Sequence, residues 1–188
     1  MLSAHDIFEM SQPEKVKKKQ TTRPDRRRIN FSSMVVYAFI GAMLVGRIFF
    51  FSMIEVSGES MSPTLHTSDR LVLMRHTSID RFDIVVFDRE ENGTKLVKRV
   101  VGMPGDTVSY IDCVLVVNGE SIVEPYLTAS AQDCGDDLAP QQVAEGAYIV
   151  FGDNRQGSLD SRALGPVRHE LVVGEVSARL WPASTLLR

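Results

Sequence analysis

Three short segments hold most of the residues whose side chains could do chemistry: SGESMSPTL (57–65), KLVKRVVGMPGDTV (95–108) and GDNRQGSLDSR (152–162). The first places Ser60 in a proline-containing turn. A serine hydroxyl is a weak nucleophile until a neighbouring base takes its proton. The chemistry of this chain therefore depends on which residue could serve Ser60 as a base.

Histidine is the usual base, and three histidines follow residue 54: His66, His76 and His169. None has a distinctive context, and they lack the spacing of zinc ligands. Lysine is the alternative, provided that burial lowers its pKa until the amine is neutral. After residue 30 the chain has 11 arginines but only two lysines, Lys95 and Lys98.

The second segment is typical of a β-strand, in which side chains alternate between two faces. Lys95 and Lys98 then point to opposite sides, and Lys98 shares its face with Leu96 and Val100. An amine among apolar neighbours predicts a desolvated base. Taken alone, Lys98 would more often be a solubilising surface charge, because most lysines are exposed.

The third segment follows the apolar run YIVF and is rich in Asp, Asn, Arg and Ser. A polar loop leaving a buried strand is where a rigid scaffold presents functional groups, although a solvated loop could be equally polar. From its position, Ser158 could hydrogen-bond to a lysine and orient it. Asp153 and Asp160 could pair with arginines.

The elements that must position these residues fall into a basic tail over 1–30, an apolar helix over 31–54 and a domain over 55–188. Residues 1–30 carry eight Lys/Arg and four Asp/Glu, a net of +4, which leaves −7 for the other 158 residues of a chain at −3. A basic tail on an acidic body does not indicate a nucleic-acid partner for the body.

The apolar segment predicts an uncleaved membrane anchor. From Ser33 to Met53 there are 21 residues with one charge, Arg47. At ~1.5 Å per residue, a helix of that length spans the ~30 Å hydrocarbon core. The basic residues before it predict a cytoplasmic N-terminus and an extracytoplasmic domain at the plasma membrane. A cleaved signal peptide is excluded because the basic lead and the apolar run are too long.

The domain over 55–188 is predicted to be mainly β, an antiparallel sheet or barrel-like fold. Its strand-length apolar runs are RLVLMR, DIVVFDR, LVKRVVG, CVLVVNG, AYIVFG and LVVGEVSARL. Pro104-Gly105-Asp106 predicts a turn, and Asn118-Gly119 a type I′ hairpin. Residues 128–142 are expected to form a surface loop. Cys113 and Cys134 could be bridged or free, and the sequence leaves both open.

Together the three segments resemble the conserved boxes of type I signal peptidases, membrane-bound serine proteases that remove signal peptides. The resemblance runs in order over about residues 31–185. It implies that Ser60 is the nucleophile and Lys98 the general base, a Ser–Lys dyad without histidine. It also implies a mostly antiparallel β catalytic domain that needs no cofactor and no metal.

The resemblance further implies that Ser158 orients Lys98. Two ion pairs, Asp153 with Arg99 and Asp160 with Arg162, would hold the loop against the dyad.

Two positions depart from the family pattern. Some members carry a hydroxyl residue two positions before the nucleophile, where it helps to bind the oxyanion. This chain has Gly58 there, as relatives from Gram-positive bacteria do, so the backbone N–H of Ser60 would be the main donor and a second donor stays open. RFDIVVF resembles a further box usually written with Gly where this chain has Phe82, a departure expected to be harmless.

By resemblance the substrate is a preprotein whose signal peptide binds as an extended strand, with small residues at the first and third positions before the cut. The edge near Lys95 and Val97 would pair with it. Shallow pockets would come from Met61, Leu65 and Val97. The apolar residues 49–54, with Met61, would dip into the lipid bilayer, the second expected partner.

Rival interpretations come from other classes of protein. A membrane-anchored, non-catalytic β domain that binds a protein partner has no reason to keep Ser60 and Lys98 together with Ser158. A self-cleaving repressor of the SOS type shares the dyad but needs a DNA-binding helix-turn-helix. A sortase-like transpeptidase needs a catalytic cysteine with His and Arg, a setting that Cys113 and Cys134 lack.

Overall fold

The computed structural model describes residues 31–75, 77–127, 134–182 and 185–186. The predicted cytoplasmic tail over 1–30 lies outside the described residues, as do His76 and part of the loop predicted over 128–142. The chain divides into two compact units, Met1–Phe39 and Ile40–Arg188, and both sheets described below belong to the second.

The first described element is the helix α2 (Phe31–Phe50), which ends earlier than the predicted anchor over 31–54. The next residues form the strand β1 (Phe51–Glu55), because their backbone finds antiparallel partners in β2 (Arg70–Met74). Among the described residues, no helix has both the length and the hydropathy needed to cross a membrane. The predicted transmembrane span is therefore not confirmed.

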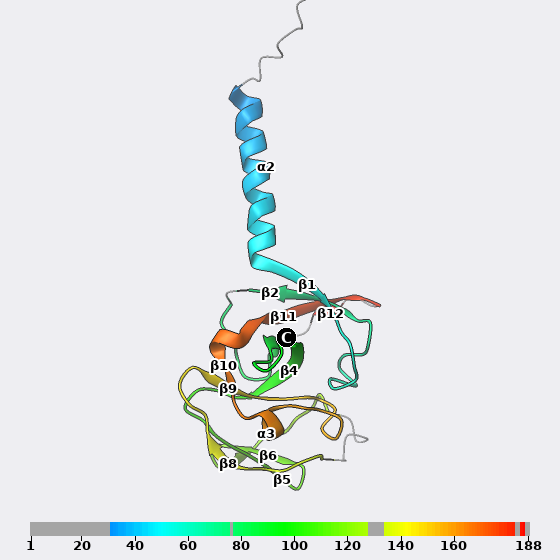
Figure 1. Ribbon diagram of the computed structural model, residues 1–188, viewed down its shortest axis with the longest axis vertical. Coiled ribbons are helices and arrows are strands. Elements are labelled where there is room, and N and C mark those ends of the chain that lie inside the picture. Colours follow the sequence, from blue (N-terminus) through cyan, green and yellow to red (C-terminus); the bar gives the residue numbers. More distant parts are fainter. Residues whose placement is uncertain (1–30, 76, 128–133, 183–184, 187–188) are drawn as a thin grey trace, which may run out of the picture. The chain divides into compact units, whose positions relative to one another are not determined.

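The larger sheet has eight antiparallel strands in the order β1-β2-β11-β3-β4-β9-β10, with β12 paired to β11 (Figure 1). Its remaining strands are β3 (Ile84–Asp88), β4 (Lys95–Gly102), β9 (Ala147–Phe151), β10 (Val167–Arg168), β11 (Val172–Trp181) and β12 (Thr185–Leu186). Side chains on β3 are buried on both faces, which explains its unbroken apolar run.

The smaller sheet has the order β7-β6-β5-β8. Its strands are β5 (Thr107–Ile111), β6 (Val114–Val117), β7 (Glu120–Ser121) and β8 (Leu138–Gln142). The prediction of a mainly β, antiparallel fold is thus confirmed. The prediction of a surface loop over 128–142 is wrong at its end, because Leu138–Gln142 form β8 and pair with β5. A polar edge strand that contains Pro140 and buries only Leu138 carries little strand signal.

The predicted turns and the two cysteines fall at the connections of the smaller sheet. Asn118 and Gly119 both have positive φ, 53° and 84°, as a type I′ turn between β6 and β7 requires. Gly105 has a φ of 88° in the turn before β5, a conformation that suits glycine. Cys113 and Cys134 form a disulfide, which settles the alternative that the sequence left open.

Three buried clusters make up the core. One packs Val108 and Tyr110 of the smaller sheet against Phe151 of β9. The other two cover opposite faces of β3, so that Val86 packs with the segment before β2 and Val85 packs with β9. The segment that contains Ser60 and the strand that contains Lys98 are therefore fixed to one core.

Two short helices follow β9: α3 (Ser161–Leu164) and the 3-10 turn η2 (His169–Leu171). Asp160 caps the N-terminus of α3, where its side chain accepts a hydrogen bond from the backbone N–H of Arg162. This cap fixes the end of the polar loop over 152–160.

Candidate active site

The turn that carries Ser60 is closed at its base and anchored by apolar side chains. The N–H of Val56 donates to the carbonyl of Asp69 at 2.9 Å, and the N–H of Ser68 donates back to the carbonyl of Val56 at 2.9 Å. Met61 and Leu65 are 1% and 0% exposed. The turn is thus part of the core, and Ser60 is presented from a rigid base.

The backbone conformation at Gly58 disfavours a hydroxyl residue two positions before Ser60. Its φ is +101°, which residues with a Cβ rarely adopt. Its N–H donates to Oγ1 of Thr67 at 3.2 Å, and that hydroxyl donates to Oε1 of Glu59 at 2.7 Å. The hydrogen bonds from Thr67 lower the pKa of Glu59. A side chain at position 58 would strain this backbone.

Lys98 contacts Ser60 directly. Its Nζ atom donates to Oγ of Ser60 at 2.7 Å and to the carbonyl of Val97 at 2.9 Å, and the residue is only 2% exposed. Burial lowers the pKa of Lys98 to about 8, although the carboxylates of Asp160 and Asp153 act in the opposite direction. A neutral amine at this place could take the proton of the Ser60 hydroxyl.

The polar loop over 152–160 is docked on the backbone of Ser60. A Cβ at Gly152 would lie 2.4 Å from the carbonyl oxygen of Ser60 and 2.1 Å from Oγ of Ser158. The N–H of Asn154 donates to the same Ser60 carbonyl at 3.1 Å. Only glycine lets the loop approach this closely.

Both ion pairs expected from the family resemblance are present. Arg99 binds Asp153 in a bidentate manner, with Nε to Oδ1 at 2.9 Å and Nη2 to Oδ2 at 2.6 Å. Asp153 also accepts from the Thr64 hydroxyl, so it connects the strand of Lys98 with the turn of Ser60. Nη2 of Arg162 lies 2.8 Å from Oδ2 of Asp160. The same Oδ2 atom accepts a hydrogen bond from the N–H of Gly152 at 2.9 Å.

Sequence reasoning missed the buried partners of the loop. Arg155 is 1% exposed and forms an ion pair with Glu124, while its guanidinium lies 5.0 Å from the ring centroid of Tyr110. The guanidinium of Arg99 lies 3.9 Å over the ring of Tyr126, and burial raises the pKa of that phenol. The sequence over 120–127 shows no periodicity that would predict the burial of Glu124 and Tyr126. Their contacts with Arg155 and Arg99 arise only from the tertiary fold.

Ser158 does not hydrogen-bond Lys98. Its Oγ atom is buried without a hydrogen-bond partner among the described residues. The carbonyl of Val97 instead receives the second proton of the amine. The structure therefore corrects the expectation that a hydrogen bond from Ser158 orients Lys98. The backbone carbonyl of the neighbouring residue, Val97, accepts a hydrogen bond from the amine instead.

A hollow of about 350 Å³ lies beside Ser60 and Lys98. Its walls come from residues 54–57, which begin in the last two residues of β1 and continue past the strand, and from residues 95–98 of β4. Met61 and Val97, two of the three residues expected to form the substrate pocket, line this hollow. Leu65 does not line this hollow; its side chain packs in the cluster with Leu71 and Leu73.

One edge of β4 is open along this hollow. On one side Lys95 to Arg99 pair with β3, but the pairing with β9 on the other side begins only at Arg99. Within the described ranges, residues 95–98 therefore have no strand partner on that second side. An extended peptide could pair there.

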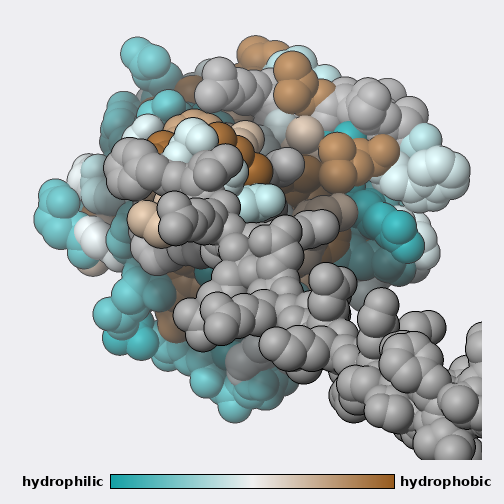
Figure 2. Space-filling view, turned by 90° about the horizontal axis from the view of Figure 1, so that it is seen from above, coloured by the Kyte–Doolittle hydropathy of each residue, from teal (hydrophilic) through white to brown (hydrophobic). Residues whose placement is uncertain are grey.

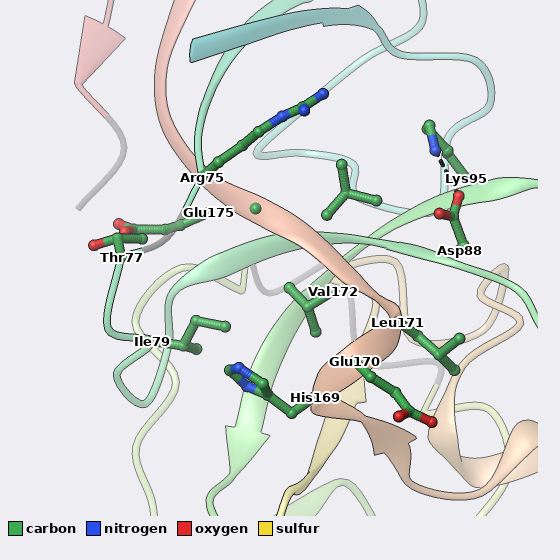
Figure 3. Close-up of a pocket in the computed structure, with 12 residues that line it drawn as sticks. Arg75, Thr77, Ile79, Asp88, Lys95, His169, Glu170, Leu171, Val172 and Glu175 are labelled. Carbon is green, nitrogen blue, oxygen red and sulfur yellow. Dashed lines mark hydrogen bonds and ion pairs between the residues drawn. The ribbon is translucent and has the colours of Figure 1, made fainter. Parts of the chain in front are cut away.

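A second hollow, of about 480 Å³, contains neither Ser60 nor Lys98 (Figure 3). His169 lines it and lies with Nδ1 3.0 Å from the Tyr148 hydroxyl, while Lys95 and Asp88 form an ion pair on its rim. No described histidine hydrogen-bonds Ser60, and the imidazole in this hollow has no serine among the lining residues. The hollow beside Ser60 is the candidate active site.

A serine hydroxyl bonded to a buried lysine, on a mainly antiparallel β domain, is the arrangement of serine peptidases that use lysine in place of histidine. The family model for "Signal peptidase, peptidase S26" matches residues 28–181. The chain therefore belongs to the signal peptidase family, peptidase S26, and is a serine protease of the hydrolase class.

Two individual signal peptidases agree with the family. Signal peptidase I of Bacillus licheniformis is 39% identical over 152 residues, which cover 74% of this chain and 81% of the relative. Signal peptidase I of Streptococcus pneumoniae is 33% identical over 184 residues, with 78% and 90% covered. A solved signal peptidase I from Enterococcus faecalis is 38% identical, has a TM-score of 0.48, and covers 53% of this chain and 97% of its own.

Proposed function

We propose that this peptidase removes N-terminal signal peptides from exported preproteins, cutting after small residues with Ser60 as nucleophile and Lys98 as general base. The observation that carries the proposal is the 2.7 Å hydrogen bond from the buried Lys98 amine to Ser60 Oγ, beside a hollow with an open strand edge. No other described side chain hydrogen-bonds that hydroxyl.

In the first half of the reaction, neutral Lys98 takes the proton of Ser60 as Oγ attacks the carbonyl carbon of the scissile peptide bond. The oxyanion that forms accepts a hydrogen bond from the N–H of Ser60, a contact worth ~3–4 kcal/mol in the transition state. The ammonium of Lys98 then protonates the leaving amine, and an ester of Ser60 remains. In the second half, Lys98 activates the water that hydrolyses this ester.

Substrate specificity follows from the walls of the hollow. The signal peptide pairs as an extended strand with the open edge of β4, so alternate side chains point toward Met61 and Val97. These walls leave room for small side chains at the first and third positions before the cut. Leu65 does not line the hollow and is therefore left out of this set.

The peptidase acts at a membrane in this proposal, with its basic tail in the cytoplasm and its catalytic domain outside. The sequence over 31–54 supports attachment, and apolar side chains are exposed on β1 and β11, the two strands that flank β2 in the larger sheet: Phe51, Met53, Leu180 and Trp181. Figure 2 shows apolar patches among polar ones on the face seen from above. Met61 is buried and takes no part in this surface.

Lipid attachment has its own test. Met53→Asp with Trp181→Asp should weaken flotation with phospholipid vesicles, because an exposed apolar side chain gains from the interface and a carboxylate does not. Val123→Asp, at another exposed apolar position, is the control. Unchanged flotation of the double variant would argue against this surface.

The function is tested by incubating the full chain with a preprotein in detergent or lipid. The parent should cut after a small-x-small sequence, while Ser60→Ala and Lys98→Ala should not; Ser121→Ala, at an exposed serine of β7, should cut like the parent. An inert parent would favour the rival, a membrane-anchored β domain that binds a protein partner. Cleavage by Lys98→Ala would exclude the lysine mechanism.

A further inference from the structure

The peptide unit between Glu59 and Ser60 is held from its carbonyl side. The carbonyl oxygen of Glu59 accepts two hydrogen bonds at 3.1 Å each, one from the N–H of Ser62 and one from Nδ2 of Asn154. The first bond lies within the turn itself. The second comes from the polar loop, 95 residues further along the chain.

The N–H of this same peptide unit is the proposed oxyanion donor. A trans peptide is planar, so its C=O and N–H point in opposite directions. Fixing the Glu59 carbonyl therefore fixes the direction of the Ser60 N–H. That N–H donates to no other group in the part of the chain that the structure describes, which leaves it free for the substrate.

The side-chain amide of Asn154 is itself oriented. Its Oδ1 atom accepts from the N–H of Gly157 at 3.1 Å, so its NH₂ group must be the part that faces Glu59. Its backbone N–H also donates to the carbonyl of Ser60 at 3.1 Å. Asn154 thus holds two successive carbonyls, those of Glu59 and Ser60, on either side of the nucleophile.

We propose that Asn154 is a positioning residue, whose side-chain amide aims the Ser60 N–H at the oxyanion of the transition state; this rests on the proposed function. Hydrogen bonds to the carbonyl also polarise the peptide and strengthen its N–H as a donor. The residue touches neither substrate nor the reacting atoms. Its loss should therefore lower kcat and leave KM nearly unchanged.

The test compares two variants that share only the loss of the Nδ2 donor. Asn154→Asp keeps the acceptor for Gly157, and Asn154→Ala introduces no charge. Both should lower kcat by about 10- to 100-fold, a part of the effect of removing an oxyanion donor outright. Gln156→Glu is the matched control, because it makes the same amide-to-acid change at an exposed position of the loop.

A second readout separates positioning from general damage. A peptide aldehyde ending in a small residue forms a bond from Ser60 Oγ to its carbonyl carbon, the hydroxyl proton passes to Lys98, and the aldehyde oxygen becomes an oxyanion-like group. Its affinity should fall by the same factor as kcat in both variants. The affinity of the same peptide as a carboxamide, which forms no such bond, should stay at the parent's value.

The outcomes are distinct. If the parent cuts its preprotein and the Asn154 variants match it, the positioning role is wrong while the proposed function stands. If aldehyde and carboxamide peptides lose affinity alike, the residue is merely structural and the inference also fails. A parent that neither cuts nor binds the aldehyde overturns the proposed function and the inference together.

Discussion

Nζ of Lys98 lies 2.7 Å from Oγ of Ser60, although 38 residues separate them in the chain. Antiparallel pairing with β3 holds the lysine, and a turn anchored in the core presents the serine. The amine is buried at this contact, so its pKa falls to about 8 instead of the ordinary 10.5. Protonation of this one group should govern the activity.

The pH dependence of kcat/KM should follow Lys98. Only the neutral amine can accept the Ser60 proton, so kcat/KM should rise with pH through a midpoint near the pKa of about 8. Lys98→Arg, which stays protonated, should be inactive throughout. A rise of kcat/KM centred near pH 6.5 instead, which is about the ordinary pKa of histidine, would contradict the assignment of Lys98 as the base.

Removing the buried amine should stabilise the fold. The folded-state pKa of about 8 lies below the unfolded value of 10.5, so at pH 7 the charged amine opposes folding. One pKa unit corresponds to about 1.4 kcal/mol. Two acceptors lose their donor in Lys98→Met, which offsets part of the gain, and a net of about 1–2 kcal/mol is expected from urea unfolding.

The stability difference between Lys98→Met and the parent should change with pH in a defined direction. Between pH 8 and 10.5 the unfolded chain binds the extra proton, so the parent should gain stability as the pH rises, and the advantage of Lys98→Met should shrink. A variant that is less stable than the parent at pH 7 would show that the amine contributes more by its hydrogen bonds than burial costs.

Breaking the ion pair of Asp153 should destabilise the domain strongly. Asp153→Asn leaves the guanidinium of Arg99 buried without a counter-charge, which costs about 3–5 kcal/mol. Glu90→Gln breaks an exposed pair with Arg168 and should cost less than about 1 kcal/mol. Equal losses in chemical denaturation would mean that burial does not decide the value of these pairs.

A methyl group at Gly152 should disrupt the active site sterically. The Cβ of Gly152→Ala would meet the Ser60 carbonyl oxygen at 2.4 Å and Ser158 Oγ at 2.1 Å, so the loop must move away from the dyad. We expect a loss of kcat/KM of at least about tenfold. Gly146→Ala, which meets no atom within 4 Å but has a φ of +74°, should cost about 1 kcal/mol of stability and retain activity.

The disulfide should stabilise the domain without taking part in the chemistry. Cys113 and Cys134 are 21 residues apart, and opening a loop of that size costs about 3 kcal/mol in the chain-entropy account. The carbonyl of Cys134 also accepts from Nη1 of Arg162 at 2.7 Å. Cys113→Ser with Cys134→Ser should lower the Tm and keep kcat at low temperature; loss of kcat in the folded variant would assign the bridge a role in the site.

Sequence reasoning succeeded where a pattern is local. The apolar runs of β3 and β9 and the Asn118-Gly119 turn follow from strand length and turn chemistry, and each lies where it was predicted. It was wrong at the end of α2 and at β8, because both boundaries depend on hydrogen-bond partners far away in the chain. Phe82, where the family resemblance would place glycine, has a φ of 77°, a conformation that glycine adopts without strain.

The sequence by itself determined the chemical types of the site: one serine in a proline turn, one of two late lysines, and a polar loop with the carboxylates for Arg99 and Arg162. Only the tertiary structure decided the contacts of these groups. It brought the Lys98 amine within hydrogen-bond distance of Ser60 and of the Val97 carbonyl instead of Ser158, buried Leu65, and bonded the Asn154 amide to the Glu59 carbonyl. The reason is physical: residue types follow from local composition, whereas a hydrogen bond of about 3 Å depends on how distant strands and loops pack together.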